Sequence, residues 1–98
     1  MNKSEKELAR RISIINEFGL HARPAALISK LAKNAKYNVW IVRNEEKVDA
    51  TSIIDILSLA CLKGTEITLQ VDDRADIDIL DQITALAETG FKEKGSRE

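Results

Sequence analysis

The chain has 98 residues, of which 44% are hydrophobic and 32% are charged. This length fits a single domain over 1–98, and the composition is that of an ordinary globular protein. There is no apolar run of the roughly 20 residues that a membrane span needs and no apolar stretch typical of a secretory signal, so we expect no membrane insertion. The net charge of −1 argues against a general nucleic-acid binder.

The first half of the chain contains the residues for a strand, a helix and a hairpin. Residues 8–15 are rich in β-branched residues and predict a strand. Residues 22–35 predict a helix, with apolar residues at helical spacing. Residues 38–50 predict a hairpin, in which Val39 and Ile41 face one side of the sheet and Trp40 and Val42 face the other. The apolar stripe of the helix consists of Leu27, Ile28, Leu31, Ala32 and Ala35.

The second half predicts a short helix, a strand and a longer helix. Residues 52–59 are expected to form a helix capped by Ser52. Residues 65–71 alternate between polar and apolar side chains, as a half-buried strand does. Residues 75–89 form the clearest helix, which Gly90 ends. Its buried stripe is Ile79, Leu80, Ile83, Leu86 and Ala87, and the aspartates 76, 78 and 81 lie where the helix dipole favours negative charge.

The element order is therefore strand, helix, strand, strand, helix, strand, helix. Strands with helices on one face predict a two-layer α+β sandwich. The polar and charged ends, 1–6 and 92–98, are expected to be flexible around a core of about 8–90. Residues 1–49 carry a net charge of +4 and the remainder −5, which favours an acidic or phosphorylated partner for the first half.

The stretch GLHARPA at 19–25 contains the only histidine and the only proline of the chain. His21 is expected at the N-cap of the first helix, with Arg23 and Pro24 in the first turn, where proline removes no helical hydrogen bond. The backbone amides of Ala22 and Arg23 point outward from a positive helix end and, with the guanidinium of Arg23, predict an anion site. An imidazole beside such a site is a nucleophile aimed at a phosphoryl group. The alternative interpretation is a histidine N-cap next to a solvated arginine.

No metal or cofactor is expected. His21 and Cys61 provide only two ligands, and two ligands do not fill a coordination sphere. The single cysteine excludes an internal disulfide and fits a reducing cytoplasm.

GLHARPAA resembles the phosphorylation-site motif of HPr, the histidine-containing phosphocarrier family of the bacterial phosphoenolpyruvate:sugar phosphotransferase system. The resemblance extends over about 8–90 and implies the HPr fold, an open-faced sandwich with a four-stranded antiparallel sheet and three helices on one face. It implies that His21 is phosphorylated at Nδ1, that Arg23 stabilises the phosphoryl group, and that the protein is a carrier rather than an enzyme. The family accepts the phosphoryl group from phosphorylated enzyme I and passes it to IIA domains of sugar permeases.

A second block, TSIIDILSLACLKGTEITL, resembles the family segment that begins with a regulatory serine. Ser52 corresponds to that serine, which HPr kinase/phosphorylase phosphorylates in many bacteria. Ile53, Ile54 and Leu57 correspond to the apolar patch that docks partner proteins, although a helix this short also needs at least one of them as a core anchor. Asp55 stands where many relatives have glycine, and its charge opposes a phosphate on Ser52.

The stretch IINEFGLHARPAA is also similar to the nitrogen-related branch of the family, whose members regulate rather than feed sugar uptake. A third hypothesis, from a different functional class, is a docking module that is never phosphorylated. A docking module needs neither His21 nor Arg23, so we favour the phosphocarrier, acting as a cytoplasmic monomer.

Overall fold

The computed structural model describes residues 7–92, and its elements follow the predicted order. The strands and helices are β1 (Ala9–Ser13), α2 (Ala22–Ala32), β2 (Val39–Arg43), β3 (Glu46–Asp49), α3 (Ile53–Ser58), β4 (Glu66–Val71) and α4 (Ile77–Glu88), with a 3-10 turn, η1 (Arg74–Asp76), before α4. The flexible ends predicted at 1–6 and 92–98 lie outside the described residues, apart from Lys92.

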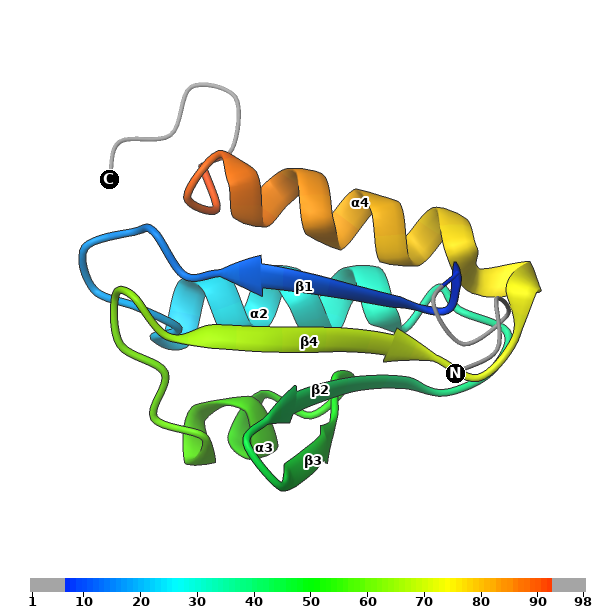
Figure 1. Cartoon of the computed structure of the whole chain (residues 1–98), viewed down its shortest axis with the longest axis horizontal. Coiled ribbons are helices and arrows are strands. Elements are labelled where there is room, and N and C mark those ends of the chain that lie inside the picture. The colour runs from blue at the N-terminus through cyan, green and yellow to red at the C-terminus, as the bar shows by residue number, and fades with distance from the viewer. Residues whose placement is uncertain (1–6, 93–98) are drawn as a thin grey trace.

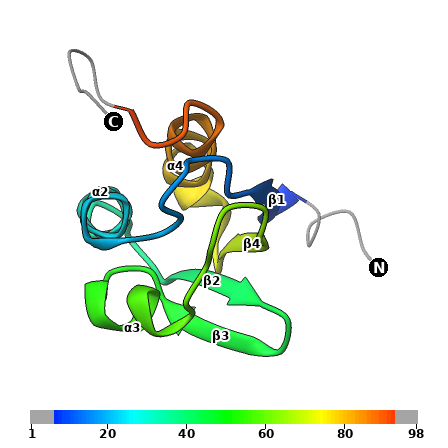
Figure 2. The same ribbon diagram turned by 90° about the vertical axis from the view of Figure 1, so that its left-hand side faces the viewer.

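The four strands form one antiparallel sheet in the order β1-β4-β2-β3. The last strand in sequence, β4, therefore lies between β1 and β2, where Ile67 pairs with Ile12 and Leu69 pairs with Ile41. Figure 1 views the sheet from its open face, with α2 behind the strands, and Figure 2 shows α2, α3 and α4 on the same side of the sheet. The predicted open-faced α+β sandwich is confirmed.

Alternation along the strands decides which face is covered. Val39 and Ile41 are buried against the helices, so Trp40 and Val42 point to the open face. Trp40 is held there by polar contacts: its Nε1 donates to Asp72 Oδ1 at 3.0 Å, and Lys47 Nζ lies 4.8 Å from the ring centroid. The cation over its ring and the hydrogen bond from its indole N–H explain how this tryptophan tolerates partial exposure on the open face.

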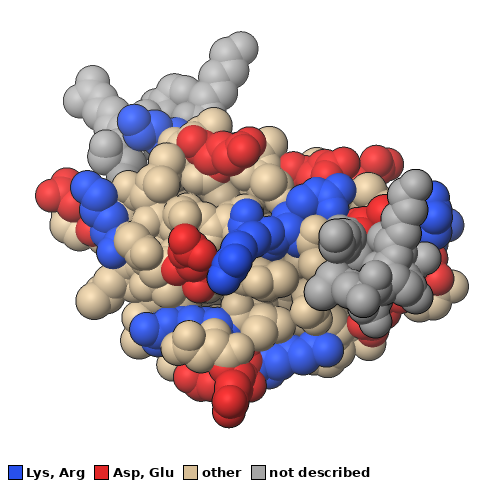
Figure 3. Space-filling model, in the orientation of Figure 1, with Lys and Arg blue, Asp and Glu red and all other residues tan. Residues whose placement is uncertain are grey.

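The open face carries both signs of charge (Figure 3). The basic first half of the sequence does not make this face uniformly basic, because Glu66 on β4 lies beside Arg11 on β1 and forms an ion pair with it. Among the helices in the described part of the chain, none has the length and apolar character needed to cross a membrane.

Several elements are shorter than predicted, including the last helix, which was predicted over 75–89 and is α4 at Ile77–Glu88. The first strand ends at Ser13 rather than 15, and α2 ends at Ala32 rather than 35. The amides of Asn34 and Ala35 bond to carbonyls three residues back, at 3.1 Å each, so the chain leaves α2 through tight turns. Of the predicted helix stripe, Ile28 and Ala32 are fully buried, whereas Leu27, Leu31 and Ala35 are only partly covered.

The end of α4 closes as predicted at Gly90, which has φ +73°. The Gly90 amide bonds to the carbonyl of Ala87 at 3.0 Å, and the Phe91 amide bonds to that of Leu86 at 2.9 Å. These two bonds form a Schellman motif, whose left-handed position glycine occupies without steric cost. The motif turns Phe91 into the core, where its side chain is fully buried.

Candidate functional site

His21 lies at the junction between a tight loop and the first turn of α2. It is the N-cap residue, with an extended backbone (φ −85°, ψ −169°), and its carbonyl accepts the first helical bond from the Ala25 amide at 3.0 Å. Its imidazole makes no capping hydrogen bond to the helix. The predicted N-cap position is confirmed, and Pro24 is buried in the first turn as expected.

The loop before His21 is packed tightly against the segment that follows α3. The Leu20 amide donates to the carbonyl of Cys61 at 2.8 Å. Gly19 has φ +66°, and a Cβ on it would collide with that same carbonyl oxygen. Only glycine fits this position, since a side chain would be strained and would also push the two loops apart.

Arg23 connects the first turn of α2 to the end of α4. Its Nη1 atom donates to the carbonyl oxygen of Phe91 at 2.8 Å. The guanidinium is therefore anchored at a residue that follows the end of α4 rather than extended into solvent. The hypothesis of a solvated arginine, which sequence alone left open, is wrong for this reason.

Phe18 lies directly beside the histidine, and the sequence analysis did not identify this contact. The Phe18 and His21 rings meet edge to face, with centroids 5.9 Å apart and an interplanar angle of 87°. Phe18 is nevertheless 65% exposed. Phe18 lies in the irregular loop between β1 and α2, where the sequence has no helical or strand periodicity that could predict which side chains meet.

The second predicted block forms α3, with Ser52 as its N-cap. The Ser52 hydroxyl oxygen accepts a hydrogen bond from the Asp55 amide at 3.2 Å, so the predicted cap is confirmed. Ile54 is 75% exposed, and Ile53 and Leu57 are each 37% exposed. The expectation that one of these three anchors the helix in the core is wrong, because Ile56, fully buried, is the anchor.

Helix α3 packs beside α2, but its two ends have different relationships to His21. Ser29 Oγ, on α2, donates to the Thr51 carbonyl at 2.7 Å, so the Ser52 end lies eight residues along α2 from His21, about 12 Å. The opposite end of α3 leads to Cys61, which bonds the histidine loop. Ser52 is thus on the flank of the site, and the structure does not bring it next to the imidazole.

Within residues 7–92, no three histidine, cysteine, aspartate or glutamate side chains come together in a way that would hold a metal ion. Cys61 is buried, and this burial raises the pKa of its thiol, an effect that the nearby charge of Arg43 opposes and that of Glu46 reinforces. A thiol kept protonated is a poor ligand and a poor nucleophile.

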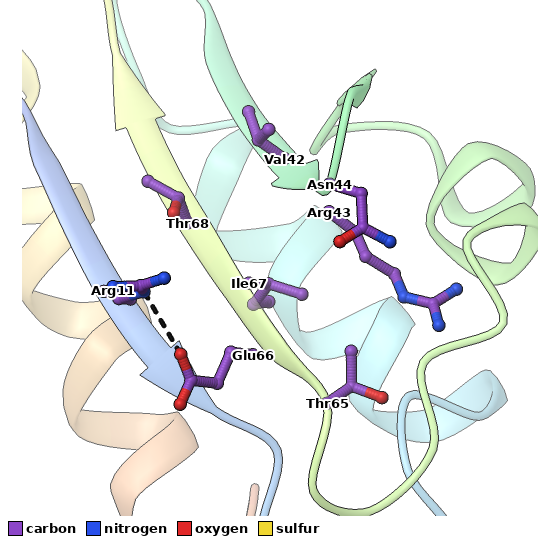
Figure 4. Close-up of a pocket in the computed structure, with 8 residues that line it drawn as sticks. All are labelled: Arg11, Val42, Arg43, Asn44, Thr65, Glu66, Ile67 and Thr68. Atoms are coloured by element: carbon purple, nitrogen blue, oxygen red, sulfur yellow. Dashed lines mark ion pairs between the residues drawn. The ribbon is translucent and has the colours of Figure 1, made fainter.

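A hollow of about 450 Å³ lies on the open face, away from the loop that carries His21. Figure 4 shows its lining, including the ion pair between Arg11 and Glu66 at 3.2 Å. Arg43 also lines it, and Arg43 Nη1 donates to the Leu59 carbonyl at 2.7 Å, which ties β2 to the end of α3. The two cations of this hollow are therefore engaged in contacts within the fold.

The arrangement at His21 has a clear chemical capability. The first-turn amides of α2 and its dipole favour negative charge at the helix end, and Arg23 adds a permanent cation there. An imidazole nitrogen next to such a region is able to attack a phosphorus atom, because the oxyanion charge that results would be stabilised there. The described residues thus place an imidazole and an arginine together at the N-terminal end of a helix.

Comparison with known proteins agrees with this arrangement. Residues 8–89 match the family model described as the PTS HPr component phosphorylation site. The chain is 38% identical to the phosphocarrier protein HPr of Cupriavidus necator and 35% identical to that of Neisseria meningitidis serogroup A; each match covers 88% of this chain and 97% of the relative. It is also 36% identical to the phosphocarrier protein NPr of Shewanella violacea, over 89% of this chain and 96% of the relative.

Solved structures show the same fold. The crystal structure of HPr-C-His from Thermoanaerobacter tengcongensis matches with a TM-score of 0.81 and 31% identity, over 92% of this chain and 98% of that one. The Bacillus subtilis protein Crh, whose crystal structure is a domain-swapped dimer, matches with a TM-score of 0.67 and 30% identity, over 86% and 97% of the two chains. Together with the family model, these matches show that the chain belongs to the HPr family of phosphocarrier proteins of the phosphotransferase system.

Proposed function

We propose that His21 is the residue that carries the phosphoryl group, accepting it from phosphorylated enzyme I and passing it to IIA domains. The observation that supports this most strongly is the position of His21 at the N-cap of α2, beside Arg23 and within a family whose model is named for its phosphorylation site. The chain would act as one HPr domain over its whole length.

In the transfer step, the Nδ1 lone pair of His21 attacks the phosphorus atom. The bond between phosphorus and its carrier atom on enzyme I breaks, and its electron pair stays with enzyme I. When an IIA domain accepts the group, its accepting atom attacks the phosphorus. The bond between phosphorus and His21 then breaks, and its electron pair returns to the imidazole. Because charge moves to the phosphoryl oxygens beside His21, the amides of Ala22 and Arg23 and the guanidinium of Arg23 stabilise the phosphorylated form.

A relay protein must meet its donor and its acceptor at one histidine. The exposed side chains of Ile53, Ile54 and Leu57 support α3 as a docking patch for both partners, since α3 packs beside α2. Because Ile56 anchors α3 in the core, all three of these side chains are available for contact with a partner. Phosphorylation of Ser52 by HPr kinase/phosphorylase would place negative charge at the edge of this patch and weaken docking.

The second candidate function is that of the nitrogen-branch paralogue, with the same histidine chemistry and regulatory partners. The 36% identity to the NPr of Shewanella violacea favours it as an alternative to sugar transport. In both cases we propose a cytoplasmic monomer that needs no cofactor, binds no nucleic acid and does not insert into membranes.

The deciding experiment uses enzyme I from the organism that encodes this chain. Incubation with labelled phosphoenolpyruvate should place the label on His21, stable to base and lost in acid, as expected of a phosphoramidate. The His21→Ala protein should take up no label, and uptake by that variant would overturn the assignment. Running the assay with the sugar and nitrogen forms of enzyme I in parallel would tell which branch this chain serves.

A further inference from the structure

We propose that Phe18 and the hollow beside it form a second docking element for the phosphotransfer partner, separate from α3. The partner segment that fits it carries an apolar side chain for the Phe18 ring and a carboxylate for the lysines around the hollow. This inference rests on the proposed role of His21 as the phosphoryl carrier.

Phe18 is carried on a turn that is fixed from both ends. The Gly19 amide donates to the Asn16 carbonyl at 3.1 Å, and Asn16 Nδ2 donates back to the Gly19 carbonyl at 2.6 Å. Asn16 itself is buried, so the second bond is shielded from water. A ring presented by a rigid turn loses little entropy on binding, which favours a role in recognition.

The position of the ring places it within reach of any partner that approaches His21. Phosphoryl transfer requires the reacting atoms of donor and acceptor to approach within about 3–3.5 Å. The Phe18 centroid is 5.9 Å from that of His21, so a protein that delivers phosphorus to the imidazole also covers Phe18. An aromatic side chain that is 65% exposed until then gains apolar burial at that moment.

The chemistry of the hollow indicates what the partner presents. The hollow has a volume of about 400 Å³ and lies between the loop after β1 and the end of α4. Ile15 and Phe18 are its apolar walls, and both are exposed. Lys63 and Lys92 line it against a single acidic residue, Glu17, so a carboxylate on the partner is electrostatically complementary.

The test measures the KM and kcat of transfer from phosphorylated enzyme I to the full chain. Phe18→Ser should raise KM about 10-fold or more, because it removes a large apolar contact, and should leave kcat within about twofold. Phe18→Leu should retain a KM close to wild type, because leucine keeps an apolar contact surface even though it has no aromatic ring. Lys63→Glu should raise KM at low salt, and this effect should shrink at high salt.

Matched controls use the opposite end of α2. Tyr37→Ser removes another exposed aromatic side chain, and Lys33→Glu reverses another exposed lysine; both should leave KM unchanged. Equal KM values for Phe18→Ser and wild type would overturn the inference. A fall in kcat alone would also overturn it, because Phe18 would then only hold the imidazole.

The outcome is distinguishable from failure of the proposed function. If wild-type protein takes up no label on His21, the phosphocarrier assignment fails. If His21 is labelled normally in wild type and Phe18→Ser with the same KM, only the docking role fails. Sedimentation should show a monomer for both proteins; a wild-type dimer that Phe18→Ser abolishes would mean that a second copy covers the ring, and would overturn the partner assigned here.

Discussion

The guanidinium of Arg23 is bonded to the carbonyl of Phe91, 68 residues further along the chain, at 2.8 Å. This bond joins the first turn of α2 to the Schellman motif that ends α4. Phe91 has φ +62° and a fully buried side chain, so its carbonyl is held in place by the core. The guanidinium of Arg23 is thus positioned by the end of a helix that contributes no residue of its own to the GLHARPA stretch.

Replacing Arg23 should slow phosphoryl transfer while the fold persists. A hydrogen bond to a charged group contributes about 1.5–3 kcal/mol, which corresponds to about 10- to 150-fold in rate if it is made only in the transition state. Arg23→Ala should show this loss in rapid-quench transfer assays, and Arg23→Lys should recover part of it because lysine keeps the charge and loses the fork. Unchanged transfer by Arg23→Ala would leave the helix amides as the whole anion site.

Gly19→Ala should be one of the most damaging single methyl additions in the chain. The new Cβ would meet the Cys61 carbonyl oxygen, break the bond from Leu20, and sit at φ +66°. We expect a loss of about 2–4 kcal/mol in the free energy of unfolding, measured by urea denaturation.

Gly64→Ala is the matched control for Gly19→Ala. Gly64 also has a positive φ, +92°, but nothing lies within 4 Å of its added Cβ. Gly64→Ala should therefore lower the free energy of unfolding only through backbone strain, by about 1–2 kcal/mol. Equal losses for the two variants would show that packing against Cys61 contributes nothing.

Asp76, which lies at the N-terminal end of α4 as predicted, has a further role that the sequence analysis did not identify. It is buried, and its two carboxylate oxygens accept the amides of Lys36 and Tyr37 at 2.8 Å each, so it fastens the exit of α2 to the start of α4. Asp76→Asn keeps only one acceptor and should lower the free energy of unfolding by about 1–3 kcal/mol. Asp78→Asn, in the exposed first turn of α4, should change it by less than about 1 kcal/mol. Similar losses for the two variants would contradict this role.

The features that could be predicted from the sequence are those that depend on near neighbours in the chain. The cap at Ser52, the N-cap at His21 and the stop at Gly90 depend on neighbours within four residues, and all three were predicted. Strand alternation also placed Trp40 and Val42 on the face opposite to Val39 and Ile41, although only the structure shows that Trp40 is on the open face. Each of these signals is contained in a short window of sequence.

The missed features all depend on residues far apart in the chain. The local sequence does not distinguish Asp76 from the exposed aspartates near it, because the amides that it binds are 39 and 40 residues away in the chain. The bond from Arg23 to Phe91 is of the same kind. Ile56 was missed as the anchor of α3 because six residues are too few for helical periodicity to separate the covered side from the exposed side.

Cys61 should react slowly with thiol reagents in the folded protein. Burial raises its thiol pKa above the ordinary value of 9.0, so little thiolate exists near neutral pH. Reaction with iodoacetamide at pH 8 should be much faster in urea than in buffer. Fast reaction of the folded protein would contradict the burial of this side chain.

The same pKa shift predicts a pH dependence of stability. The folded state holds the thiol proton more tightly than the unfolded state, so the stabilisation is complete below the unfolded pKa, near 9.0, and is lost as pH rises through the folded value. The difference in free energy of unfolding between wild type and Cys61→Ala should therefore decrease above about pH 9. A difference that stays constant up to pH 10.5 would contradict the shift.

Ser52 allows capping and regulation to be separated experimentally. Ser52→Ala removes the bond from the Asp55 amide and should lower the free energy of unfolding by about 0.5–2 kcal/mol, whereas Ser52→Asp retains a capping oxygen and should keep wild-type stability. If the flank of α3 docks enzyme I, Ser52→Asp should raise the KM for enzyme I, because it adds a charge beside the exposed Ile53 and Ile54.

The size of the Ser52→Asp effect depends on Asp55, which already carries negative charge in the first turn of α3. The Asp55→Gly background should therefore show a larger rise in KM upon Ser52→Asp than the native background, since less repulsion is present before the change. Steady-state transfer with the four proteins of this double-mutant cycle measures the coupling. If Ser52→Asp leaves KM unchanged in both backgrounds, Ser52 is a helix cap only, and phosphorylation there has no means of controlling docking in this protein.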